Sequence, residues 1–178
     1  MTDAPMTDAK NTGSPDPAAL VNNALASLGI DHEIIEIDPD FADTAQFCEK
    51  YGYPPERSAN TLLIASKKGP EQYCVCVVLA STSLDVNKRV RKLMGVRRVS
   101  FASAEQTIAV TGMMIGGVTP FGLPTDIPIY VDEAIDGLDY VILGSGSRST
   151  KIKMPGAEFA KVPGAEFISE LAVVRKTE

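Results

Sequence analysis

The sequence predicts an α+β fold in which short helices surround a mixed, strongly curved and barrel-like β-sheet. Short apolar segments of strand length alternate along the chain with segments that have helical periodicity. The two clearest strands, at residues 61–65 and 72–79, are joined by a turn that contains Gly69 and Pro70, which predicts a hairpin. The chain has 178 residues, of which 44% are apolar and 22% charged, enough for one hydrophobic core of ordinary size. We therefore expect a single domain over residues 18–178.

The N-terminal part is expected to contain a leader followed by helices. Residues 1–17 are rich in Asp, Thr, Ala and Pro and show no hydrophobic periodicity, so we expect a disordered leader. Asp16 is placed to cap a helix that has Pro17 at its first position, and Gly29 ends that helix. A second helix is expected to start near Asp43.

The remaining elements are expected to be short, and Asp85 is placed to cap one of them. Further strands are expected at 33–37, 96–101, 128–131, 140–143 and 150–154, and further helices at 86–94 and 103–110. The pentapeptide Pro-Gly-Ala-Glu-Phe occurs twice, at 155–159 and at 163–167. Each copy is expected to form a short helical turn buried through its phenylalanine, and the second copy is expected to lead into a last helix that ends at Val173.

Charge is distributed unevenly along the chain. The net charge is −6, but residues 1–60 carry 11 acidic and 3 basic side chains (−8), whereas residues 61–178 carry 12 acidic and 14 basic ones (+2). Within eleven residues there are six bases and no acid, here called the basic cluster: Lys88, Arg89, Arg91, Lys92, Arg97 and Arg98. Such a concentration of positive charge suits one polyanionic partner held at one place. The solvated face of an amphipathic helix has a similar composition and is the alternative.

Residues 111–122, here called the glycine loop, contain four glycines and Pro120 around an apolar run. Neither a helix nor a regular strand suits that composition. Glycine permits positive φ angles and lets a ligand approach the main chain closely, so we expect a rigid wall of exposed N–H and C=O groups at the floor of a small pocket. Such a wall binds carbonyls, amines or phosphates. The alternative is a hairpin or barrel corner in which the glycines serve only the bend.

Several segments, taken in order, resemble a known family. They are Asn60–Ile64, Leu84–Lys88, the glycine loop, Asp132 and Gly144–Arg148. Their order and spacing, over residues 30–172, resemble the YbaK/EbsC/ProX family of aminoacyl-tRNA editing domains, which also occur inserted in bacterial prolyl-tRNA synthetases. The most specific part is the pattern Thr-Gly…Gly-Gly-Val-x-Pro-x-Gly in the glycine loop. The resemblance implies the same mixed, barrel-like fold.

The resemblance also implies a trans-editing deacylase that hydrolyses the ester of a mischarged aminoacyl-tRNA. The discarded amino acid is expected to be small, of the alanine, cysteine or serine type, with tRNA-Pro as the expected carrier and an aminoacyl-tRNA synthetase as a further candidate partner. Because an aminoacyl-tRNA is an activated ester, its hydrolysis needs little more than a positioned water and a stabilised oxyanion. The glycine loop is implied to polarise the ester carbonyl, and the pocket to exclude the larger, correct amino acid.

The family's functional positions map onto particular residues of this chain. Residues 116–120 are implied to frame the scissile ester and the amino acid, and Ser145 with Gly146 to form the opposite wall. The residues expected in catalysis are Asn60, Gly116, Gly117 and Thr119. Those expected to bind the substrate are Val118, Pro120, Ser145, Gly146 and Lys151. The basic cluster is expected to bind the tRNA.

This sequence departs from the family at one position. The family usually has a lysine just before the strand that starts here with Thr61, and this chain has Asn60 there. Asparagine donates and accepts hydrogen bonds but brings no positive charge. Lys151 could point into the same pocket and replace the missing cation, or it could lie on the solvent face of an edge strand. Without a cation, the alternative function is a non-hydrolytic module that binds tRNA or a synthetase. A sensor of free amino acids or nucleotides is a third possibility.

No motif for a metal or an organic cofactor is visible in the sequence. The three cysteines, Cys48, Cys74 and Cys76, lack metal-ligand spacing, and the single histidine, His32, is far from Cys74 and Cys76 in the sequence. Cys74 and Cys76 lie two apart on a strand, so they face the same side and are expected to be packing residues. No apolar segment is long enough to span a bilayer and no secretory signal is recognised, so a cytoplasmic location without a membrane partner is expected.

Overall fold

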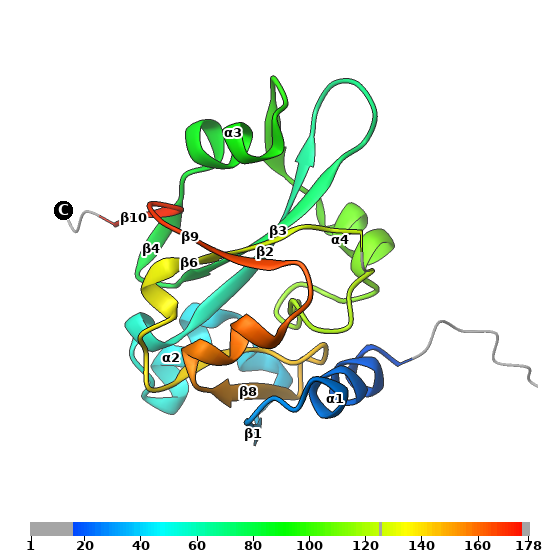
Figure 1. Ribbon diagram of the computed structural model, residues 1–178. Coiled ribbons are helices and arrows are strands. Elements are labelled where there is room, and N and C mark those ends of the chain that lie inside the picture. The colour runs from blue at the N-terminus through cyan, green and yellow to red at the C-terminus, as the bar shows by residue number, and fades with distance from the viewer. Residues whose placement is uncertain (1–15, 125, 176–178) are drawn as a thin grey trace, which may run out of the picture.

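Five strands form the sheet that crosses the middle of the molecule, in the order β5-β2-β3-β6-β9 (Figure 1). The computed structural model describes residues 16–124 and 126–175. The bounds of these strands are β2 Ala59–Ser66, β3 Tyr73–Leu79, β5 Val99–Phe101, β6 Ile129–Asp132 and β9 Ala165–Ile168. β2 pairs antiparallel with β3 and β5, whereas β3 with β6 and β6 with β9 are parallel. The predicted hairpin and the mixed α+β class are confirmed.

Two smaller sheets complete the strands that the structure describes. β1 (Glu33–Glu36), β8 (Thr150–Met154) and β7 (Val141–Gly144) form an antiparallel sheet in the order β1-β8-β7. β10 (Ala172–Val174) pairs antiparallel with β4 (Thr82–Leu84).

The prediction of a barrel-like sheet is wrong, because the five-stranded sheet does not close. β5 is only three residues long and pairs with the last part of β2, from Ile64 to Ser66. β7 approaches the start of β2, but it pairs with β8 and meets this region only at an isolated bridge between Ser58 and Ile142. A closed barrel requires continuous pairing around the ring. The first half of β2 is therefore an open edge.

Helices and single helical turns connect the strands. Their bounds are α1 Pro17–Leu28, η1 Pro39–Phe41, α2 Thr44–Tyr51, η2 Pro55–Arg57, η3 Val86–Val90, α3 Arg91–Met94, α4 Ala104–Thr111, η4 Glu133–Ile135 and η5 Gly156–Lys161. The Asp16 side chain accepts a hydrogen bond from the Ala18 N–H, and Gly29 ends α1 at a φ of 64°, as the sequence predicts. The helix predicted at 86–94 is divided, because residues 86–90 wind as a π-helix before α3 begins.

The two faces of the five-stranded sheet belong to separate hydrophobic clusters. Val75 and Val77 of β3 face the larger cluster, which includes residues of α1 and β7. Cys74 and Cys76 face the other cluster, which contains Val90 of η3, and their sulfurs lie 3.9 Å apart. The contact with Cys74 and burial raise the pKa of the Cys76 thiol, so it stays neutral. The prediction that these two cysteines are packing residues on one side of a strand is confirmed.

The two copies of the Pro-Gly-Ala-Glu-Phe pentapeptide adopt different structures. The first copy starts η5, a 3₁₀ helix, and Phe159 is fully buried, as predicted. The second copy runs into β9, Phe167 is only half-buried, and β10 lies where a last helix was predicted. The sequences are identical, so the surroundings decide: β6 presents a parallel edge to residues 165–168, and main-chain pairing along that edge overrides the local preference.

The predicted leader falls mainly on residues 1–15, which lie outside the described residues. Across residues 16–124 and 126–175, no helix has the length and apolar character needed to cross a membrane.

The two pentapeptide copies provide a test of this packing. Phe159 is fully buried and its ring stacks at 6.1 Å from that of Phe121, so Phe159→Ala is expected to lower the free energy of unfolding by about 3–5 kcal/mol. Phe167→Ala, at the half-buried position of the second copy, is the matched control and is expected to cost about 1 kcal/mol. Urea denaturation measures both values, and equal losses would contradict the assignment of Phe159 to the core.

Candidate functional site

A cavity of about 250 Å³ lies beside the open edge of β2. It is lined by Asp43, Thr44, Ala59, Asn60, Thr61, Leu62, Ile115, Gly116, Val118, Gly144 and Lys151. Four of these residues are consecutive in β2 and precede the part of the strand that β5 covers. The cavity therefore occupies the space that another strand would fill if the sheet closed into a barrel.

The glycine loop forms one wall of this cavity through Gly116 and Val118. Gly116 has a φ of 91°, a conformation that favours glycine. The neighbouring Gly117 donates its N–H to the Met114 carbonyl at 2.9 Å and accepts from the Gly146 N–H at 2.7 Å. These bonds tie Gly117 to Met114 within the loop and to Gly146 of the neighbouring turn. They also correct one expectation, because the Gly117 N–H is bound within the loop and is not free for a ligand.

Lys151 enters the cavity from β8. Its side chain is only 4% exposed, its Nζ donates to the Gly116 carbonyl at 3.1 Å, and the ammonium lies 5.6 Å from the ring centre of Phe47. The Lys151 pKa is lowered to about 8, and burial is the largest cause; the Asp43 carboxylate partly opposes this shift, the Arg148 charge adds to it, and Cys48 opposes it. Of the two positions considered for Lys151, the solvent face is therefore wrong and the cavity wall is confirmed.

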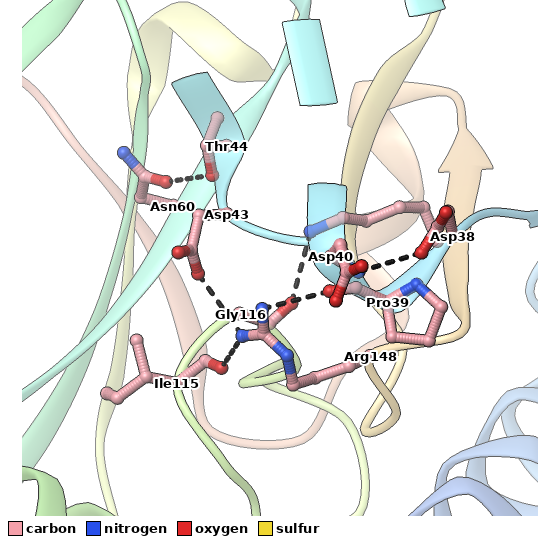
Figure 2. A network of polar contacts seen from close by, with 10 residues as sticks. Asp38, Pro39, Asp40, Asp43, Thr44, Asn60, Ile115, Gly116 and Arg148 are labelled. Carbon is pink, nitrogen blue, oxygen red and sulfur yellow. Dashed lines mark hydrogen bonds and ion pairs between the residues drawn. The ribbon is translucent and has the colours of Figure 1, made fainter. Parts of the chain in front are cut away.

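Asn60 lies at the junction of this cavity with a second, larger one. Its Oδ1 accepts a hydrogen bond from the Thr44 hydroxyl at 2.5 Å (Figure 2). Both residues also line the second cavity, of about 500 Å³, together with Ala45, Cys48, Glu49, Tyr53, Pro55, Ala80 and Arg175. Asn60 and Lys151 thus share the first cavity, and a neutral hydrogen-bonding pair stands where the family lysine is expected.

Besides Gly117, which does not line the first cavity, four other predicted site residues lie outside it. Thr119 is fully buried, and its hydroxyl has no hydrogen-bond partner among the described residues. Pro120 lines a different cavity next to α1. The Ser145 hydroxyl lies 2.9 Å from the Thr150 carbonyl, and Gly146 packs against α1. None of these four residues lines the first cavity, so we assign none of them a contact with a ligand.

The basic cluster lies at the far end of β2 from the cavity, around η3 and α3 (Figure 1). Five of its six side chains are exposed; the exception, Arg89, is partly buried and donates to the Ser169 carbonyl. The Lys67 N–H donates to the Arg98 carbonyl, which places the turn between β2 and β3 beside the cluster. Asn60 and Ser66 are six residues apart in β2, so Arg98, beside the end of that strand, lies about 20 Å from the cavity.

Three residues at the site were not assigned a role from the sequence. Arg148 connects Asp43, at the start of α2, with the Ile115 carbonyl of the glycine loop and the Pro39 carbonyl of η1 (Figure 2). Asp43 and Thr44 look in the sequence like an ordinary helix start. The sequence offers no signal for this role. In the structure, Asp43 occupies the N-cap position of α2 but its side chain makes no capping hydrogen bond, so its carboxylate is available to Arg148.

Comparison with known proteins points to one family. The family model described as "Aminoacyl-tRNA editing domain" matches residues 38–162, which include every residue that lines the first cavity. Among curated proteins, YwhH of Bacillus subtilis is 28% identical over 131 residues, which are 74% of this chain and 81% of YwhH. The "Putative Cys-tRNA(Pro)/Cys-tRNA(Cys) deacylase EbsC" of Enterococcus faecalis is 25% identical over 129 residues, which are 72% of this chain and 76% of EbsC.

Solved structures show the same fold. The hypothetical protein APE2540 superposes with a TM-score of 0.77 at 20% identity, over 86% of this chain and 99% of the other. A protein described as "a putative trans-editing enzyme for prolyl tRNA synthetase" superposes with a TM-score of 0.73 at 24% identity, over 89% of this chain and 98% of the other. The α+β fold is therefore shared with these proteins.

Burial of Lys151 predicts a pH-dependent stability. Below pH 8 the ammonium is charged in the folded and the unfolded chain, and its burial costs about 3 kcal/mol, because its pKa falls from 10.5 to about 8 on folding. Between these two values the unfolded chain binds more protons, so the free energy of unfolding rises with pH. We expect Lys151→Met to be more stable than wild type at pH 7, by up to about 3 kcal/mol, and to lose most of that advantage by pH 10.

Urea denaturation at pH 7 and pH 10 measures this difference. Lys153→Met is the matched control, because it removes the same charge from a position of β8 where the side chain is 33% exposed. The control is expected to keep the pH dependence of the wild type. An advantage of Lys151→Met that is equal at both pH values would contradict the burial of a titrating ammonium.

Proposed function

This chain belongs to the aminoacyl-tRNA editing domain family, and from that membership we propose that it is a trans-editing deacylase that hydrolyses the ester of a mischarged tRNA carrying a small amino acid. One observation carries the proposal: a small cavity beside the glycine loop contains a buried lysine on its wall. Such a site can stabilise negative charge on an ester without a strong nucleophile, which is what an already activated ester needs.

In the proposed reaction, Lys151 supplies the positive charge that Asn60 lacks. An ammonium has three N–H donors, and the Gly116 carbonyl is its one hydrogen-bond acceptor among the described residues. The remaining donors are available to the carbonyl oxygen of the ester, which becomes negatively charged as water adds to the carbonyl carbon. The low exposure of this site strengthens the attraction. Collapse of the tetrahedral species breaks the bond to the ribose oxygen, which takes up the proton given up by the attacking water and leaves as a hydroxyl, and the amino acid is freed.

The size of the first cavity favours a small amino acid. Its volume is about 250 Å³, and its apolar lining includes Leu62, Ile115 and Val118. We propose alanine, cysteine or serine as the discarded residue, because a larger side chain has no room beside the ester. The similarity to EbsC, whose name describes a Cys-tRNA(Pro) deacylase, supports tRNA-Pro as the carrier.

The second cavity is the proposed place for the terminal nucleoside. The amino acid and the base are attached to the same ribose, so their sites must adjoin. The two cavities share Thr44 and Asn60, whose hydroxyl and amide can hydrogen-bond to ribose hydroxyls. The larger volume of the second cavity and the aromatic ring of Tyr53 on its wall suit a purine base.

The basic cluster is the proposed site for phosphates of the tRNA. Its residue Arg98 lies about 20 Å from the cavity, a distance that a few unpaired nucleotides can span. With the 3′ end in the cavity, the cluster would therefore meet phosphates closer to the paired stem. None of its six residues takes part in an ion pair in the part of the chain that the structure describes, so their charges are available to a polyanion.

Deacylation assays test the proposed reaction. The purified protein is expected to release amino acid from at least one small mischarged tRNA-Pro, and Lys151→Gln to lower kcat/KM about 100-fold, because the oxyanion loses its charged partner. Since the ammonium is the active form, kcat/KM is expected to fall as the pH rises through about 8. Lys153→Gln, on the same strand, is the matched control and is expected to remain close to wild type.

The same assays separate the alternatives. Absence of turnover on every tRNA of the panel would contradict the deacylase proposal. If tRNA still bound and Asn60→Lys switched hydrolysis on, the chain would be a tRNA-binding module that lost activity with the family lysine. If free amino acids or nucleotides bound and tRNA did not, a sensor function would be favoured.

Charge substitution tests the basic cluster. We expect the double variant Arg91→Gln/Lys92→Gln to raise KM for the tRNA, to leave kcat close to wild type, and to reduce the slope of log affinity against log salt by about 2, because two phosphate contacts are lost. Lys161→Gln serves as control, because Lys161 is bound to Glu158 in η5, at the other end of the molecule (Figure 1). An unchanged salt slope in the double variant would exclude this surface from tRNA binding.

A further inference from the structure

The Arg148 guanidinium joins three segments at the rim of the first cavity (Figure 2). Its Nη1 lies 3.2 Å from Asp43 Oδ1 and also donates to the Ile115 carbonyl, and its Nη2 donates to the Pro39 carbonyl at 3.0 Å. These partners are 105, 33 and 109 residues away from Arg148 in the sequence. Three of its five N–H donors are thus bound to the protein, and the rigid planar fork fixes the directions of all of them.

Gly116 is shaped to fit this guanidinium. A Cβ atom at position 116 would lie 2.2 Å from Arg148 Nη1 and 3.0 Å from Asp43 Oδ1, so a side chain there would displace the arginine. Gly116 also accepts the hydrogen bond from Lys151 through its carbonyl. One glycine therefore contacts the rim on one side and the buried ammonium on the other.

We propose that Arg148 is a positioning residue of this site: it holds the glycine loop against the start of α2 and thereby fixes the Gly116 carbonyl, and with it the Lys151 ammonium, at the cavity wall. The catalytic consequence rests on the proposed deacylase function, whereas the structural consequence does not. A direct contact of Arg148 with a phosphate is the competing role, but most of its donors are already bound within the protein.

The charges around Lys151 give this role a signature that simple structural support would lack. Asp43 and Arg148 are the charged groups that act on its pKa, Cys48 is the third titratable group, and the Phe47 ring covers the ammonium. Because Arg148 lowers the Lys151 pKa and Asp43 raises it, removal of either charge shifts that pKa in a known direction. Arg148→Gln is expected to shift it upward and Asp43→Asn downward.

A set of four variants tests the proposal: Arg148→Gln, Arg148→Lys, Asp43→Asn and, as matched control, Arg57→Gln. Arg57 forms a comparable ion pair with Asp139 but does not line the cavity. The Lys151 pKa is read from the Cε signal of isotopically labelled lysine by NMR, with the signal assigned by its loss in Lys151→Gln. Hydrogen exchange of the Gly117 amide, which is bound to Met114, reports how firmly the loop is held.

Arg148→Gln is expected to lower kcat about 10- to 100-fold with KM for tRNA nearly unchanged, to raise the Lys151 pKa, and to accelerate exchange at Gly117. Arg148→Lys keeps the charge but cannot make three directed contacts. We therefore expect a lower kcat and faster exchange of the Gly117 amide, while the Lys151 pKa stays near that of the wild type. Arg57→Gln should change none of these quantities.

Two results would overturn the proposal. The first is that both the Lys151 pKa and the Gly117 exchange rate stay at their wild-type values in Arg148→Gln. If Arg148→Gln fails to fold, a wild-type Gly117 exchange rate in Arg148→Lys has the same meaning. The second is a raised KM with intact kcat, which would make Arg148 a phosphate contact. If the wild type shows no deacylation at all, the proposed function fails, and the NMR and exchange measurements still decide the role of Arg148.

Discussion

The open edge of β2 is the constraint on which the site depends. In an antiparallel ladder the main-chain N–H and C=O of one residue point toward one neighbouring strand, and those of the next residue point toward the other. The Leu63 carbonyl accepts from the Ala102 N–H on the β5 side, so Thr61, two residues earlier, turns its N–H and C=O to the same side, where β5 has ended and the cavity begins. A closed barrel would have paired these groups and filled the space. The unclosed sheet leaves both the room and the main-chain groups of Thr61 for a ligand.

A buried ammonium is costly, and its surroundings explain how it persists. Lys151 has a carbonyl to donate to, an aromatic ring beneath it and the Asp43 carboxylate nearby, while Arg148 opposes its charge. A residue kept in place against its own desolvation cost is typical of a functional site. The buried positive charge of the cavity thus lies on β8, while on β2 Asn60 bonds to Thr44 and places a neutral polar group at the same cavity.

Local signals in the sequence predicted the local structure, and failed where distant segments decide the outcome. Helix starts with caps, such as Asp16 and the reciprocal Ser103–Gln106 pair, lie where the sequence predicts helices, as do the hairpin strands. The closure of the sheet and the second pentapeptide copy were predicted wrongly, because strand pairing far along the chain governs both. At the site, glycine spacing located the cavity wall, but no sequence pattern shows that Arg148 reaches back to Asp43, because an ion pair between residues 105 apart leaves no periodic trace.

The dispersed origin of the site has a consequence for biosynthesis. The cavity is built from the start of α2 near the beginning of the domain, from β2, the glycine loop and β7, and finally from β8, and β9, the parallel neighbour of β6, arrives still later. Contacts between such distant segments form slowly, because the closure of long loops must precede any gain from packing. A nascent chain therefore has no assembled site until residue 151 has left the ribosome. Truncated products that end before β8 lack Lys151 altogether, however well their hairpin and first helices have formed.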